Sequence, residues 1–144
     1  MKILLDEDVP QPLLDVVRHL LRGHVVEHVY TRGWQGKKDR PLFADAAAAR
    51  FETIVTNNLK QFNDPGECSA IQKSGLHHVS YALDNGLDGL ARASASIVAA
   101  IRPVVAELEA ASTQRIVRIH QIATKQKRYT LTDPATDPPS AYWP

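Results

Sequence analysis

The chain has 144 residues, of which 44% are hydrophobic and 23% charged, and its formal net charge is +1. This length and balance predict one globular domain with a single core, and they exclude a disordered chain. No apolar run approaches the roughly 20 residues that span a bilayer, and the N-terminus lacks a signal-peptide pattern. The single cysteine, Cys68, excludes an internal disulfide and a Cys-based zinc site. We therefore expect a soluble, cytoplasmic protein that makes no contact with a membrane.

The first part of the chain alternates between strand and helix patterns. Short apolar runs predict strands over residues 3–5, 24–30, 52–56 and 76–83. Apolar residues at helical spacing, or alanine-rich composition, predict helices over residues 10–22, 40–51 and 67–73. Asp8 is the expected N-cap of the first helix and Gly23 its stop. This alternation of strands and helices predicts an α/β fold with a small, mostly parallel four-stranded sheet that is covered by helices.

The C-terminal part has a different character. Apolar residues at helical spacing predict a long amphipathic helix over residues 87–108, which Pro103 should kink or break. Residues 115–122 and 127–132 predict a basic β-hairpin, and a proline-rich tail follows. We accordingly divide the chain into a domain (1–112), a basic extension (113–132) and a tail (133–144). The long apolar stripe predicts a homodimer.

No acidic residue lies between Glu109 and Asp133, an interval that contains the whole basic extension. Five lysines and arginines fall inside that interval: Arg115, Arg118, Lys125, Lys127 and Arg128. Such segregation suits a polyanion partner, and a solvated basic face without a partner is an equally good interpretation.

Acidic and amide side chains follow the predicted strand ends. Asp6, Glu7 and Asp8 come after the first strand, Asp39 begins the second helix, and Asn57 and Asn58 follow the third strand. Parallel strands bring such positions to one edge of a sheet, and neighbouring carboxylates are tolerated mainly when a cation neutralises them. Oxygen donors suit Mg²⁺ or Mn²⁺. Taken singly, helix capping and turn formation are the plainer explanation of most of these residues, but not of Asp6, which continues a buried strand.

Two stretches, KILLDEDVP and GHVVEHVYTRGWQGKKDRPLFADAAAARFETIVTNNLKQF, resemble the PIN-like domain family of short single-domain ribonucleases. This family is related to the VapC-type toxins of toxin–antitoxin pairs. The matching pieces are a strand ending in Leu-Leu-Asp-Glu, a Gly-His pair, a Gly-Trp-x-Gly loop, Asp39 with Leu42 and Ala46, and Val-Thr-Asn with Phe62 downstream. The resemblance covers roughly residues 2–81, and its specificity lies in the order and spacing of these pieces.

The resemblance implies a three-layer PIN-like domain that hydrolyses RNA phosphodiester bonds with Mg²⁺ or Mn²⁺, and a small cognate antitoxin as protein partner. When the catalytic and metal-binding positions of the family are matched to this sequence, the resemblance implies that Asp6, Asp39 and Asn58 hold these roles, with Asp8 or Glu7 in support. Short members of the family often carry Asp at the place of Asn58 and another acid at the place of Lys60. Because this chain has two negative charges fewer, a catalytically weakened RNA- or protein-binding module is the alternative.

Basic and aromatic residues surround these acids in the sequence. We expect cations to contact RNA phosphates and the tryptophan to stack on an unpaired base. The set comprises Arg32, Trp34, Lys37, Lys38, Arg40 and Lys60. Solvated lysines and a tryptophan packed on the domain are the plainer interpretation.

Two other enzyme classes share parts of this pattern. A haloacid dehalogenase-type phosphatase would use the Asp6-x-Asp8 pair, Lys60 or Lys73, and Asp84 with Asp88. Against it, Val9-Pro10 replaces the expected Gly-Thr-like turn, and the flap segment is missing. A phosphate-receiver domain would need an Asp at the end of the third strand, where Thr56 stands.

Overall fold

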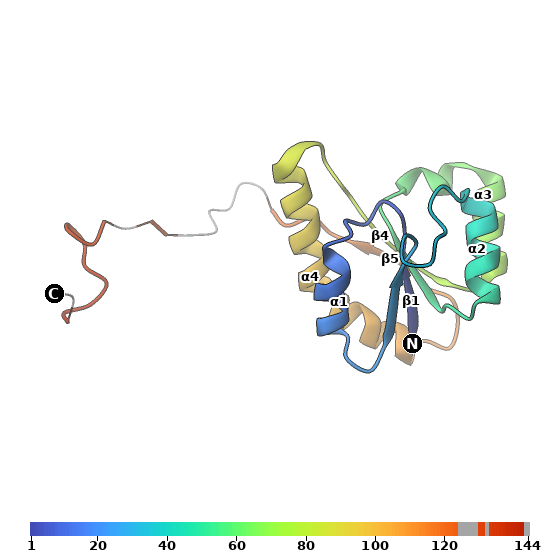
Figure 1. The fold of residues 1–144 in the computed structure, drawn as a ribbon, viewed down its shortest axis with the longest axis horizontal. Coiled ribbons are helices and arrows are strands. Elements are labelled where there is room, and N and C mark those ends of the chain that lie inside the picture. The colour runs from blue at the N-terminus through green and yellow to red at the C-terminus, as the bar shows by residue number, and fades with distance from the viewer. Residues whose placement is uncertain (124–129, 132, 143–144) are drawn as a thin grey trace.

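The computed structural model describes residues 1–123, 130–131 and 133–142. Strands and helices alternate along this part of the chain (Figure 1). In order they are β1 (Lys2–Leu5), α1 (Leu13–Leu20), β2 (Val25–His28), α2 (Asp39–Ala48), β3 (Thr53–Thr56), the 3₁₀ helix η1 (Leu59–Asn63), α3 (Pro65–Ser74), β4 (His77–Tyr81), α4 (Gly86–Ala110) and β5 (Ile116–Ile119).

All five strands form one parallel sheet in the order β2-β1-β3-β4-β5. In this register Leu5 of β1 lies between His28 of β2 and Val55 of β3. The chain first moves from β1 to one side, then crosses back and continues from β3 to the other side. The strand order therefore reverses between β1 and β3, the place where open α/β sheets bind ligands beyond their strand ends.

Helices cover both faces of the sheet. In Figure 1, α1 and α4 lie on one side of the strands, and α2 and α3 lie on the other. Because side chains alternate along a strand, Ile3 and Leu5 of β1 enter the core under α1 and α4, while Leu4 enters the core under α2 and α3. Strand β1 is thus buried on both faces, which explains its unbroken apolar sequence.

Helix α4 is long and apolar enough to cross a membrane by length and composition alone. Its inner face, however, packs into the core of the domain through Ala93, Ile97, Ile101 and Val105. The helix continues through Pro103, so the predicted break does not occur. It is a core helix of a small α/β domain, and the described residues carry no clear sign of a membrane protein.

The structure corrects the predicted sheet. It has five strands, all parallel, where four mostly parallel strands were expected. Residues 116–119 form no antiparallel hairpin strand but pair in parallel with β4, because α4 carries the chain back across the sheet in a crossover. The sheet therefore extends past residue 112. The other predicted hairpin strand, 127–132, lies outside the described residues apart from Thr130 and Leu131, which form no strand.

The structure also differs from the sequence analysis at two places near the ends of strands. Asp8 does not cap α1, which begins at Leu13 after Pro12. Two prolines explain the delay, since each disfavours helical backbone in the residue before it, and Pro10 and Pro12 precede the first turn. After β3 the chain forms the short 3₁₀ helix η1, for which the sequence analysis predicts no helix.

Gly89 provides a test of how tightly α4 is seated. A Cβ atom at this buried glycine would overlap the backbone carbonyl of Asp84, which cannot swing aside as a side chain can. We expect Gly89→Ala to lower the free energy of unfolding by roughly 1–3 kcal/mol, measured by urea denaturation.

A matched control is the helical glycine Gly66 of α3. A Cβ there would meet only the guanidinium of Arg40, a flexible and exposed side chain. Gly66→Ala should therefore be neutral or slightly stabilising, because alanine is the better helix former. Equal losses in both variants would show that backbone crowding at Gly89 is not the cause.

Candidate functional site

A chain of hydrogen bonds joins the ends of β1, β3 and α2 at the carboxyl edge of the sheet. The Thr56 hydroxyl donates to Asp6 Oδ2 over 2.7 Å and accepts the Asn58 backbone N–H over 3.1 Å. The Asn58 side-chain amide then donates to Asp39 Oδ2 over 3.1 Å. The three predicted catalytic residues are therefore brought into one bonded group, with Thr56 as the link between them.

Asp6 is the buried member of the group. It is 6% exposed, and its two bonds come from neutral donors, Thr56 and the Glu7 N–H at 2.7 Å. Burial raises the pKa of the Asp6 carboxyl above its ordinary value; the two hydrogen bonds oppose this rise, and the charges of Asp8 and Asp39 add to it. No cationic side chain within the described residues pairs with Asp6 to compensate its charge.

The loop that carries Glu7 and Asp8 is fixed by its backbone. The buried His28 ring is bonded to the Val9 carbonyl over 2.7 Å, and the Tyr81 hydroxyl donates to the Asp8 carbonyl over 3.2 Å. The Asp8 side chain is exposed, yet partial burial and the charges of Glu7 and Asp39 raise its pKa. Asp8 is therefore placed beside the bonded group without capping a helix.

Glu67 is an acid of this region that the sequence-based prediction missed. It lies in the first turn of α3, where its N–H bonds the capping side chain of Asp64 over 2.9 Å. Burial and the nearby charges of Asp39 and Asp64 raise the pKa of its carboxyl, and the Arg40 guanidinium opposes this rise. The Asp-x-x-Glu spacing of a helix start after the third strand could have pointed to it.

The oxygen atoms of this group are of the chemical type that binds a hard cation. Asp6, Asp8, Asp39 and Asn58 offer carboxylate and amide oxygens, the ligands of Mg²⁺ and Mn²⁺, and the carboxylates raise one another's proton affinity. Within residues 1–123, 130–131 and 133–142, no three acid, histidine or cysteine side chains are gathered closely enough to hold one ion. An ion bound here would have to draw the side chains together.

Most of the predicted RNA-contacting residues have partners within the domain. Arg32 pairs with Glu27 over 2.9 Å and lies over the Trp34 ring, which itself packs edge-on against Phe51. Lys37 is paired with Asp45, and Arg40 pairs with Asp64 over 3.0 Å. Lys38 and Lys60 are exposed and form no ion pair with any described residue. These two lysines are the freest cations of the predicted set.

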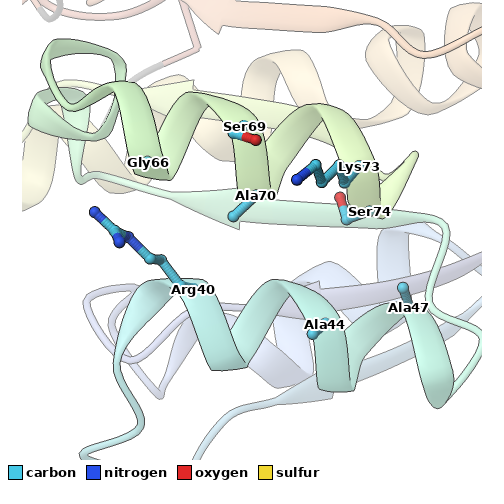
Figure 2. A pocket seen from close by; sticks show the side chains of 8 residues that line it. All are labelled: Arg40, Ala44, Ala47, Gly66, Ser69, Ala70, Lys73 and Ser74. Carbon is cyan, nitrogen blue, oxygen red and sulfur yellow. The ribbon is translucent and has the colours of Figure 1, made fainter.

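The groove between α2 and α3 is separate from the acids. It has a volume of about 330 Å³ and is lined mainly by small side chains. Figure 2 shows Arg40 extending from α2 toward Gly66 at one end of the groove and Lys73 lying along α3. None of Asp6, Asp8 or Asp39 lines it.

One acid of the rival phosphatase interpretation, Asp84, has partners away from this site. Asp84 accepts from Arg92 and Gln121, each over 3.1 Å, beside the start of α4. Thr56 ends β3, where a receiver domain would place its phosphorylated Asp.

Comparison of the chain with protein-family models, with curated proteins and with solved structures finds no match. The assignment of a function therefore depends on the geometry and chemistry of the residues themselves.

Proposed function

We propose that this chain is a Mg²⁺- or Mn²⁺-dependent endoribonuclease of the PIN-like type, acting in the cytoplasm as the toxin of a toxin–antitoxin pair. The observation that carries the proposal is the bonded group Asp6–Thr56–Asn58–Asp39 at the switch point between β1 and β3. Its carboxylates have no cationic partner among the described residues. A buried, uncompensated Asp6 is costly for folding, which favours a functional reason for it.

The chain's own residues would divide the work in the following way. Thr56 and the Glu7 N–H hold the Asp6 carboxylate in one orientation, and the Asn58 amide holds Asp39. Asp6, Asp39 and the Asn58 carbonyl oxygen would hold the ion, with Asp8 in support. When bound, the ion supplies activation of a water molecule and charge stabilisation at the phosphate.

Substrate contacts would come from the edge of the same site. Lys60 lies two residues after Asn58, and Lys38 directly precedes Asp39. Both side chains are exposed and free of ion pairs within the described residues, so each can reach a phosphate next to the acids without breaking an existing bond.

RNA cleavage is the direct test of this proposal. Purified protein should cut RNA in the presence of Mn²⁺ or Mg²⁺, and Asp39→Asn should lower the rate by about a hundredfold or more, measured by gel assay. The matched control is Asp15→Asn on α1, whose side chain is 94% exposed, and it should cut at the original rate. Undiminished cleavage by Asp39→Asn would remove the assignment, and hydrolysis of p-nitrophenyl phosphate without RNA cleavage would favour the phosphatase.

The toxin role is tested by measuring the growth of cells that express the chain. Expression of the chain alone should arrest growth, unless Asp6 is changed, and co-expression of a small adjacent gene product should relieve the arrest. Growth arrest that is unaffected by Asp6→Asn would separate toxicity from the proposed site.

A catalytically weakened RNA-binding module is the second candidate. It is favoured by the neutral Asn58 and by the lack of a three-acid group in the described part of the chain. RNA binding by fluorescence anisotropy, without metal-dependent cleavage of any RNA tested, would select this candidate.

A further inference from the structure

The described residues of the domain leave the outer face of α4 exposed. An 18-residue stretch of this helix is as apolar as a membrane span, yet only 33% of it is buried. The buried part faces the sheet and α1, and the opposite side of the helix faces away from the domain. An exposed helix face of this kind is a candidate contact surface.

Apart from Ala106, the exposed residues of this face form a pattern that reads the same in both directions. At helical spacing they are Asp88, Ala91, Ala95, Ala99 and Arg102, and all five are exposed. Ala91 and Ala99 lie four residues before and after Ala95, while Asp88 and Arg102 lie seven residues before and after it. Opposite charges therefore stand at equal distances from a central alanine.

We infer that two copies of the chain associate through antiparallel packing of α4 on α4, centred on Ala95. In a two-fold interface residue i of one copy meets residue j of the other, and j meets i. Antiparallel pairing about Ala95 places Asp88 of each copy opposite Arg102 of its partner, which gives two identical ion pairs. Between them the three alanines of each helix form a narrow contact surface that lets the backbones approach closely.

The charges of the face are available for this role. Asp88 and Arg102 form no ion pair with any described residue of their own chain. On one side of the face lies α1, which packs beside α4. On the other side the Ile122 N–H bonds the Ser96 hydroxyl over 3.2 Å. The outer face is thus framed by the domain but not covered by the described residues.

The association state and a charge-swap cycle test the inference. Sedimentation equilibrium of the full chain should show a monomer–dimer equilibrium. Asp88→Arg and Arg102→Asp should each raise the dimer dissociation constant by about tenfold, since each creates two like-charge contacts. The double variant, Asp88→Arg with Arg102→Asp, should restore the original dissociation constant. Thermal unfolding of each variant shows that the fold is retained.

Cross-linking checks the register without altering charge. In a Cys68→Ser background, Ala95→Cys should form an intermolecular disulfide on oxidation, because only the central position meets itself across the two-fold axis. Glu107→Cys, an exposed α4 position off this face, is the control and should not cross-link. A monomer at every concentration, a dimer insensitive to both charge reversals, or binding of the chain to phosphatidylglycerol vesicles in place of self-association would overturn the inference.

Discussion

Replacing Asp6 by Asn is expected to abolish metal-dependent RNA cleavage and, at the same time, to stabilise the folded protein. Asparagine keeps the shape of the side chain and can still accept the Glu7 N–H, but it removes a buried charge that burial and two neighbouring acids disfavour. At pH 7 the free energy of unfolding should rise by on the order of 1 kcal/mol, measured by urea denaturation without added metal. Cleavage should fall by about a hundredfold or more.

The gain in stability should depend on pH with a definite sign. The pKa of Asp6 in the folded state is raised above the ordinary 3.8, so the folded state holds this proton more strongly than the unfolded state. Stability of the original protein is therefore lost as the pH rises from 3.8 through the folded-state pKa. The advantage of Asp6→Asn should be full at neutral pH and shrink toward pH 4.

A control variant separates this effect from general charge removal. Asp15→Asn also removes one negative charge, but from a side chain that is 94% exposed and whose ion pair with Arg18, at 4.0 Å, is open to solvent. Its stability should therefore stay within about 0.5 kcal/mol of the original protein at both pH values. If Asp6→Asn proves less stable than the original protein at pH 7, Asp6 contributes to folding and the functional reason for its burial loses its support.

Much of the fold follows from local sequence patterns. The apolar runs of β1 and β3 and the alanine-rich α2 are recognisable because a buried parallel strand and a strong helix former each leave a local signature. The placement of Asp6, Asp39 and Asn58 at one edge also followed, since parallel strands expose their carboxyl ends together.

Other features depend on contacts between distant residues. Ile116–Ile119 has the alternation of a hairpin strand, and only the crossover through α4 makes it a parallel partner of β4. Glu67 joins the acids because α3 follows β3 closely and packs beside α2. The sequence predicts Arg32 and Lys37 as RNA-contacting residues. Only the folded chain shows that they form ion pairs with Glu27 and Asp45.

Acidification should destabilise the protein through His78. This β4 residue is fully buried, its Nε2 lies 3.0 Å from Gln61 Oε1, and its ring contacts those of Phe62 and Phe43. Burial lowers its pKa from 6.5 to about 4. Between these values the unfolded state binds a proton that the folded state does not, so stability falls as the pH drops from 6.5 to about 4. The total loss should be about 3 kcal/mol.

The contribution of His78 is separated from that of the carboxylates, which titrate in the same pH range, by comparing how steeply the free energy of unfolding changes with pH in different variants. His78→Gln retains an N–H donor toward Gln61 but cannot be protonated, so its free energy of unfolding should fall less steeply between pH 6.5 and 4.5. His19→Gln, an exposed substitution on α1, should keep the original slope. The overall stability of His78→Gln does not affect the test, because the difference in slope is the quantity compared. Parallel curves for all three proteins would mean that His78 is protonated as readily in the folded chain as in the unfolded one, which its dry, aromatic surroundings argue against.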